Sequence, residues 1–136
     1  MIANAIYSIL TENVGLAALV GTRVYSSLVP ERCDRPYISF RLLSVDADST
    51  LDGHDGLMDA LFQVDCIAAS QDGARSVADA TRLALADYKG TVGGHETLRF
   101  RFEGEMDDWE LEVEGGEKLI GRVVQTWGVW YCESNI

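Results

Sequence analysis

The stretch Met58-Asp59-Ala60-Leu61-Phe62-Gln63-Val64-Asp65-Cys66-Ile67-Ala68 carries the clearest structural pattern in the chain. Every even-numbered position in it is apolar, whereas Asp59, Gln63 and Asp65 interrupt the odd-numbered positions. Successive side chains of a β-strand point to opposite faces of its sheet, so a period of two is typical of a half-buried strand. We therefore predict a strand over residues 58–68.

A second strand with the same pattern precedes it. Residues 37–45 place Ile38, Phe40 and Leu42 on one side, with polar residues between them. Residues 46–56 are rich in Asp and Gly, which are typical of loops. We expect the two strands to form a hairpin around that loop.

Helical spacing appears on both sides of this hairpin. After it, Ser70 can cap a helix whose apolar stripe recurs every three or four residues and which Gly90 would end; its stripe is Ala74, Val77, Ala78, Thr81, Leu85 and Tyr88. Before it, residues 2–10 have the same spacing, and a second helical piece over residues 14–20 ends where Gly21 favours a left-handed cap. A short strand is expected within residues 22–28.

The C-terminal part predicts further strands. Leu98, Phe100 and Phe102 alternate with charged residues and predict a one-sided strand. The closing segment, residues 122–132, is apolar on both sides, so we expect it to be central in the sheet or to contact another subunit with one face. The candidate interface residues on that strand are Trp127, Val129 and Tyr131.

Between these strands lies an acidic segment. Residues 103–117 contain eight acidic residues and no basic one, and apolar and acidic residues alternate before Gly115-Gly116, a favoured hairpin turn. We expect a projecting acidic hairpin arm at residues 105–121. A solvated face, a partner-docking surface and a channel lining remain alternatives. An exposed tryptophan among acids is typical of an interface anchor, so the candidate interface residues here are Trp109, Glu110, Leu111, Glu112 and Val113.

Together the elements predict a single α+β domain over residues 1–136, with a mostly antiparallel sheet of about four to five strands and two main helices packed on one face. A chain of 136 residues and 14.9 kDa fits one hydrophobic core. No stretch approaches the roughly 18 apolar residues that a membrane span needs, so we expect no membrane contact.

Charge and motifs exclude several functions. The net charge of −11 disfavours binding to a nucleic-acid backbone, but suits a channel through which DNA passes without sticking. Cys33, Cys66 and Cys132 have no C-x-x-C spacing and are expected to be reduced thiols, while His54 and His95 have no second ligand nearby. A segment starting at Asp48 matches a calcium loop poorly, and no nucleophile or phosphate-binding motif occurs. We expect no enzyme activity, cofactor or metal.

Several short motifs, in order, resemble the tail-completion or tail-terminator proteins of long-tailed phages, prophages and gene-transfer agents. They are Ala17-Ala18-Leu19-Val20-Gly21-Thr22-Arg23-Val24-Tyr25, Arg35-Pro36-Tyr37-Ile38, Thr50-Leu51-Asp52-Gly53, Phe62-Gln63-Val64-Asp65-Cys66 and Val129-Trp130-Tyr131. The alanine-rich helix from Gln71 to Tyr88 continues the resemblance, which covers nearly the whole chain. The departure is the acidic arm, which is shorter in most relatives.

The resemblance implies a structural subunit that forms a ring, expected to be a hexamer, and that caps the tail tube and joins it to the neck of the head. Its implied partners are other copies of the chain, the tail tube protein and the head-tail connector protein, with DNA only as passing cargo. The implied location is the virion tail, assembled in the cytoplasm of the host bacterium. Two alternatives stay open: another neck or minor tail role such as head completion, and a small α+β ligand-binding module.

Overall fold

The computed structural model describes residues 2–30, 33–50, 53–86, 88, 95–112 and 118–133. Three helices, α1 (Ile2–Glu12), α2 (Val14–Val20) and α3 (Gln71–Ala86), accompany five strands in this part of the chain. The strands are β1 (Val24–Ser26), β2 (Tyr37–Thr50), β3 (Gly53–Ala68), β4 (His95–Glu112) and β5 (Lys118–Glu133). This composition confirms the predicted α+β class.

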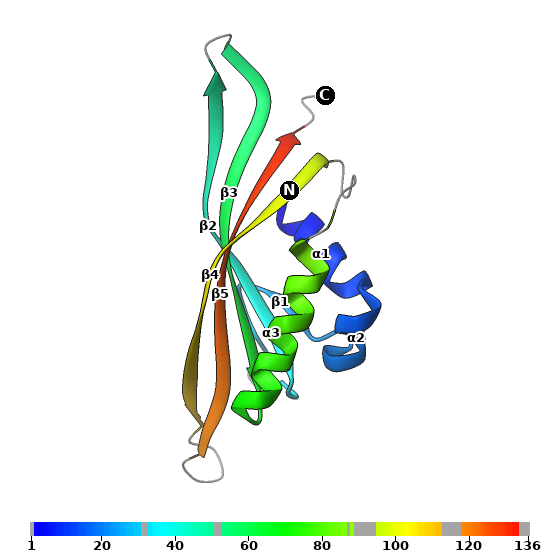
Figure 1. Ribbon diagram of the computed structural model, residues 1–136, viewed down its shortest axis with the longest axis vertical. Helices are drawn as coiled ribbons and strands as arrows, with labels where there is room; N and C mark the ends of the chain where they lie inside the picture. The colour runs from blue at the N-terminus through cyan, green and yellow to red at the C-terminus, as the bar shows by residue number, and fades with distance from the viewer. Residues whose placement is uncertain are drawn as a thin grey trace.

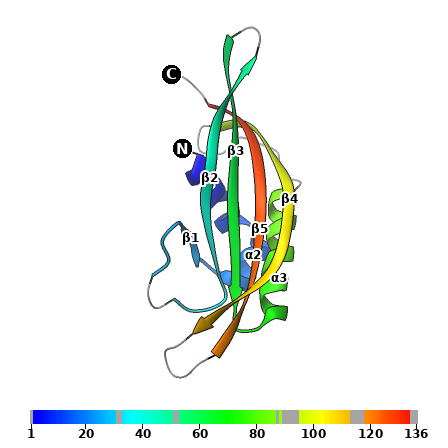
Figure 2. The same cartoon turned by 90° about the vertical axis from the view of Figure 1, so that its left-hand side faces the viewer.

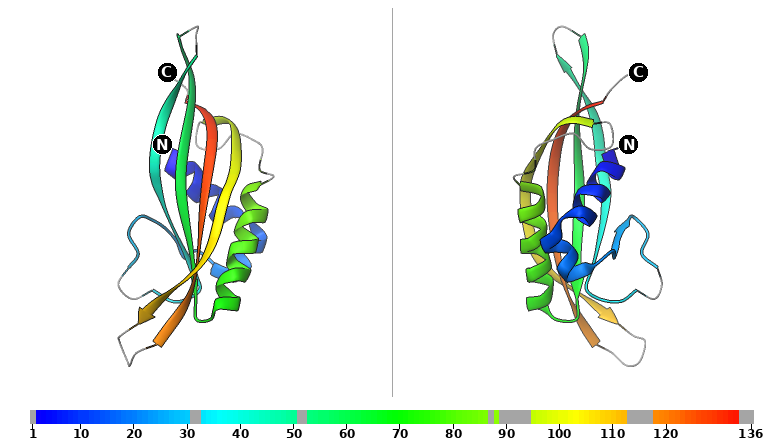
Figure 3. Two further views of the ribbon diagram at one scale, coloured as in Figure 1. Left: turned by 60° about the vertical axis from the view of Figure 1, so that its left-hand side comes forward. Right: turned by 90° about the vertical axis from the view of Figure 1, so that its right-hand side faces the viewer.

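The five strands form one sheet in the order β1-β2-β3-β5-β4. The pair β1–β2 is parallel, and the other three pairs are antiparallel. Figures 1 and 3 show the helices on one side of this sheet. The other face of the sheet is therefore open, and Figure 2 views the molecule from that side.

Two strand predictions were wrong in their extent. Residues 46–50 and 53–56 continue β2 and β3 instead of forming a loop, since Asp46 pairs with Asp59 and Thr50 with Gly53. The predicted strand around Phe100 and the first strand of the predicted arm are one strand, β4. Cross-strand pairing outweighs the low strand propensity of Asp and Gly in both places.

The long strands give the molecule two projecting hairpins. Figure 1 shows that β2–β3 extends beyond the helices at one end of the sheet and β4–β5 at the opposite end. The segment predicted as an acidic arm is the distal part of β4–β5, where Trp109 pairs with Gly121 and Glu112 with Lys118. The predicted turn residues, Gly115 and Gly116, lie outside the described residues.

The helix ends follow local chemistry. Ser70 caps α3 as predicted, because its hydroxyl oxygen accepts a hydrogen bond from the Gly73 N–H at 3.1 Å. Asn13 caps α2 in the same way, accepting from the Leu16 N–H at 2.9 Å. Gly21 ends α2 with a φ of 60°, and its ψ of −126° lies outside the left-handed helical region that was predicted. The α3 helix ends at Ala86, and Gly90 is outside the described residues.

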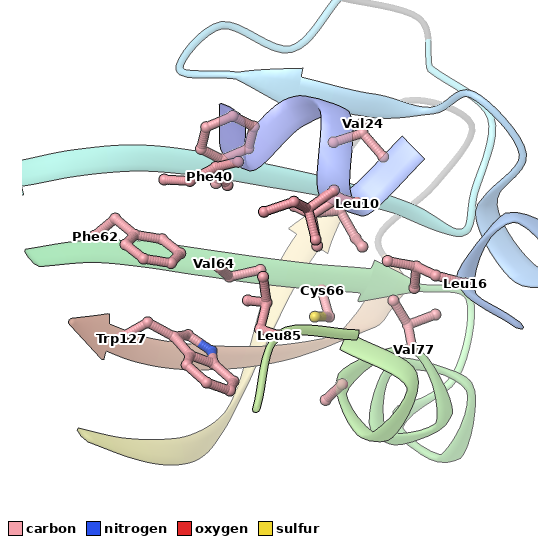
Figure 4. Close-up of a cluster of buried hydrophobic side chains, with 14 of the residues drawn as sticks. Leu10, Leu16, Val24, Phe40, Phe62, Val64, Cys66, Val77, Leu85 and Trp127 are labelled. Atoms are coloured by element: carbon pink, nitrogen blue, oxygen red, sulfur yellow. The ribbon is translucent and has the colours of Figure 1, made fainter. Parts of the chain in front are cut away.

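The core lies between the helices and the covered face of the sheet. Figure 4 shows buried strand and helix side chains meeting there, with Trp127 near Leu85 of α3 and Cys66 near Val77 of α3. The even-numbered residues of β3 from Ala60 to Ala68 are all buried, as their alternation predicted. Each large apolar side chain buried in this way contributes roughly 1.5–3 kcal/mol to stability.

Among the described residues, no single helix is long and apolar enough to cross a membrane. Taken together, α1 and α2 reach that length and apolarity, with a bend of 83° between them.

Candidate interaction surface

The β4–β5 hairpin carries apolar side chains that remain in solvent. Trp109 is 64% exposed, and Leu119 on the paired strand is 61% exposed. Alternate residues of a strand share a face, and the register places Trp109 opposite Gly121 and Leu119 opposite Leu111. The predicted exposure of Trp109 is thus confirmed, and Leu119 is a neighbour on the same face that the sequence analysis did not single out.

A groove lies where this hairpin meets the start of α3. Its volume is about 360 Å³, and its floor and walls are mostly apolar. Gly121 allows the two elements to approach this closely, because a Cβ there would lie 2.3 Å from the Ser70 carbonyl oxygen. The lining residues are Ala69, Ser70, Gln71, Arg75, Asp107, Trp109, Leu119, Ile120 and Gly121.

Hydrogen bonds connect the β4–β5 hairpin to the start of α3. The Gln71 side chain accepts from the Arg122 N–H and donates to the Arg122 carbonyl, both at 3.2 Å. On the open face, the Arg122 guanidinium contacts Asp65 at 2.7 Å and Asp108 at 4.0 Å. The groove is therefore held by main-chain and side-chain contacts on both faces of the sheet.

Arginines outside the acidic segment pair with some of its first acids. Arg75 of α3 donates to Asp107 at 2.6 Å, and this hydrogen bond holds the pKa of that carboxyl below its usual range. Arg101 pairs with Glu103 at 3.1 Å. These acids are paired with arginines but stay partly solvated, since the side chains of Asp107 and Glu103 are 50% and 43% exposed. The pairing could not be read locally, because Arg75 precedes Asp107 by 32 residues.

The closing strand β5 takes the central position in the sheet that was one of its two predicted alternatives. Trp127, Val129 and Tyr131 point into the core and are at most 2% exposed, so their assignment as interface residues is corrected. β5 lies between β3 and β4, and the helices cover the face that carries these three residues. The exposed tryptophan of this strand is Trp130, on the open face, where the Arg101 guanidinium lies 4.7 Å from the centre of its ring.

A buried polar network supports the core beneath the hairpin. Gln125 is fully buried, and its amide group donates to the Ala78 carbonyl at 2.9 Å and to the Glu105 carboxylate at 2.8 Å. Its amide oxygen accepts from the Trp127 indole N–H at 2.9 Å. The network ties β5 to both α3 and β4. The network could not be predicted from the sequence, because a glutamine among apolar residues shows no hydrogen-bond partner in the local pattern.

The remaining predicted site residues are only partly described. Glu110, Leu111 and Glu112 lie in β4, and only their backbone is described. Val113 lies outside the described residues. No group of three metal-ligating side chains occurs in the described part of the chain. Of the cysteines, Cys66 is buried.

Comparison with known proteins adds a family and a fold. A family model described as "Tail completion protein gp17" matches residues 4–117. Among solved structures, a chain described as "Virion of native gene transfer agent (GTA) particle" is similar with a TM-score of 0.62 and 24% identity, covering 96% of this chain and 93% of that chain. This second likeness shows a shared fold. Comparison with curated proteins finds no match.

Proposed function

This chain belongs to the tail completion protein gp17 family, and we propose that within a phage-type tail it acts as the terminator, a ring-forming subunit that caps the tail tube. Family membership confirms the resemblance seen in the short sequence motifs, and it identifies the chain as a structural protein of the virion tail. The ring, which we propose to be a hexamer, and its position between tube and neck go beyond family membership. Assembly takes place in the cytoplasm of the host bacterium.

The observation that carries the proposal is the pair of opposed hairpins. A subunit between the tail tube protein and the head-tail connector protein needs contact surfaces at two opposite ends. The β2–β3 and β4–β5 hairpins extend from opposite ends of one sheet (Figure 1). The β4–β5 hairpin also exposes Trp109 and Leu119 beside a mostly apolar groove. Exposed aromatic side chains that become buried when a partner binds often contribute most of the binding energy of an interface.

The charge of the chain agrees with a passage for DNA. A ring with a net charge of −11 in each subunit repels phosphate groups, so DNA can slide through without being held. In this role DNA is cargo and the chain needs neither a cofactor nor a catalytic residue. A non-enzymatic role is the one we propose.

The test combines particle composition with a variant of the groove. The wild-type chain is expected in purified particles at the junction of tail and head, as located by labelled antibodies in electron microscopy. Trp109→Ala is expected to fold normally and to lower the number of tails joined to heads, because an exposed anchor contributes to contacts outside the chain. Absence of the chain from purified particles would contradict the proposed function.

Trp130→Ala is the matched control. Trp130 is also a partly exposed tryptophan, but it lies on the open face of the sheet, away from the groove. Joining of heads and tails is expected to survive this change. Normal joining of heads and tails in Trp109→Ala particles would show that the groove does not take part in joining. If the wild-type chain is located elsewhere in the neck or tail, a head-completion or minor tail role is favoured.

A further inference from the structure

Both edges of the sheet have unpaired strand backbone. β4, with 18 residues, is the last strand on one side and pairs only with β5 in the described sheet. On the other side, the three-residue β1 pairs with β2 only at residues 38–40, and no other described strand pairs with that edge of β2 at residues 41–50. Rows of free N–H and C=O groups on an edge are templates for pairing with another chain.

Exposed apolar side chains flank both edges. Met106 lies exposed on β4. Leu43 and Val45 lie exposed on the open part of β2. Apolar side chains beside a free edge are typical of surfaces that become covered by another chain.

The two edges have different charge. β4 contains seven acidic and two arginine residues, a formal charge of −5. Residues 41–50 of β2 contain one arginine and two aspartates, a formal charge of −1. Pairing of two β4 edges would bring two strongly acidic strands together, whereas pairing of β4 with this part of β2 brings an acidic strand beside a nearly neutral one.

Strand direction allows the second arrangement. β2, β3, β5 and β4 alternate in direction across the sheet, so β2 and β4 run opposite to each other. Two copies placed side by side in the same orientation therefore present β4 of one to β2 of the next as an antiparallel pair. A contact that joins two different surfaces in this way repeats around a ring.

We propose that the outer edge of β4 in one copy pairs with residues 41–50 of β2 in the next copy, so that the sheets join around the ring. This inference rests on the proposed function for the ring itself and adds which surfaces form the subunit contact. The Trp109 groove lies on the distal part of β4–β5 and is left to partners at the end of the ring.

The test uses two variants, each blocked at one edge. The first carries Met106→Glu, and the second carries Leu43→Glu and Val45→Glu. All three side chains are exposed, so both variants are expected to keep the wild-type circular dichroism spectrum and melting temperature. Each glutamate would place an unpaired charge in the proposed contact, which strongly disfavours association. Val14→Glu, at an exposed position of α2, is the matched control.

Sedimentation velocity is expected to show self-association of the wild type and the control, and monomers of each blocked variant alone. An equal mixture of the two variants should form a dimer and stop there, because only one intact β4 edge and one intact β2 edge remain per pair. Continued assembly of either variant alone would overturn the edge pairing while leaving the ring in place. If the wild-type chain stays monomeric to millimolar concentration, both the edge pairing and the self-assembled ring are contradicted. Finding the chain in purified particles would still support a role in the tail.

Discussion

Replacement of Gln125 by leucine tests the polar network beneath the hairpin. Leucine has nearly the volume of glutamine but cannot form the three hydrogen bonds, to Ala78, Glu105 and Trp127, that the amide group makes at 2.8–2.9 Å. The variant should still fold, because leucine is apolar and suits a fully buried position in this core. Its cost therefore comes mainly from the partners that lose their hydrogen bonds.

The partners differ in how well they can be compensated. The Trp127 indole N–H is fully buried and would be left without an acceptor, which costs about 1–3 kcal/mol. The Glu105 carboxylate keeps some access to water, because its side chain is 28% exposed, and it still lies 3.9 Å from the Arg82 guanidinium. Losing the hydrogen bond from Gln125 should therefore cost Glu105 about 1 kcal/mol or less. We expect Gln125→Leu to lower the free energy of unfolding by about 1–4 kcal/mol in total.

The assay is urea unfolding followed by far-ultraviolet circular dichroism. Gln63→Leu is the matched control, because Gln63 is half-buried on the open face and its side chain donates to Asp65, where water can replace the lost bond. We expect that control to cost less than about 1 kcal/mol. In a Trp127→Phe background, which has no indole N–H, Gln125→Leu should cost less than in the wild type. Equal costs at Gln63 and Gln125, or no coupling to Trp127, would refute the reasoning.

Three further predictions follow from named contacts. Burial raises the pKa of the Cys66 thiol to about 12, so the folded chain holds this proton more tightly than the unfolded chain. Because the unfolded thiol has a pKa of about 8.5, urea unfolding at successive pH values should show stability falling by about 1.4 kcal/mol per pH unit above that pH, until the folded thiol titrates. Gly121→Ala would place a Cβ against the Ser70 backbone, and should cost about 1–3 kcal/mol in the same assay. Arg75→Gln removes the hydrogen bond that lowers the pKa of Asp107, so that carboxyl should titrate at higher pH in NMR spectra. In the wild type, the stabilisation from this pair is present at neutral pH and is lost as the pH falls through the lowered pKa of Asp107.

Each of these predictions has its own control. Cys66→Val should abolish the alkaline decline, and a decline of the same slope without the thiol would assign it to other groups. Gly104→Ala adds a Cβ with no heavy atom within 4 Å, so a loss as large as that at Gly121 would contradict the close-approach argument. Arg82→Gln should leave the titration of Asp107 unchanged, because Arg82 pairs with Asp79 and Glu105 instead.

The sequence by itself determined the elements whose pattern is local. The alternation along β3 predicted its buried face from Ala60 to Ala68, and the stripe from Ala74 to Leu85 predicted the buried face of α3. These patterns succeed because side-chain direction within a strand or helix depends only on backbone geometry. The exposure of Trp109 and the cap at Ser70 also follow from neighbours in sequence.

The tertiary structure alone decided everything that depends on which strands meet. An apolar strand such as β5 can be covered by helices or by another subunit, and only its place between β3 and β4 showed that Trp127 is core and Trp130 is exposed. Only the tertiary structure also showed that β2 and β3 extend through Asp- and Gly-rich residues and that Arg75 pairs with Asp107. The physical reason is that hydrogen-bond ladders and ion pairs form between residues far apart in the chain, and local pattern carries no information about distance in space.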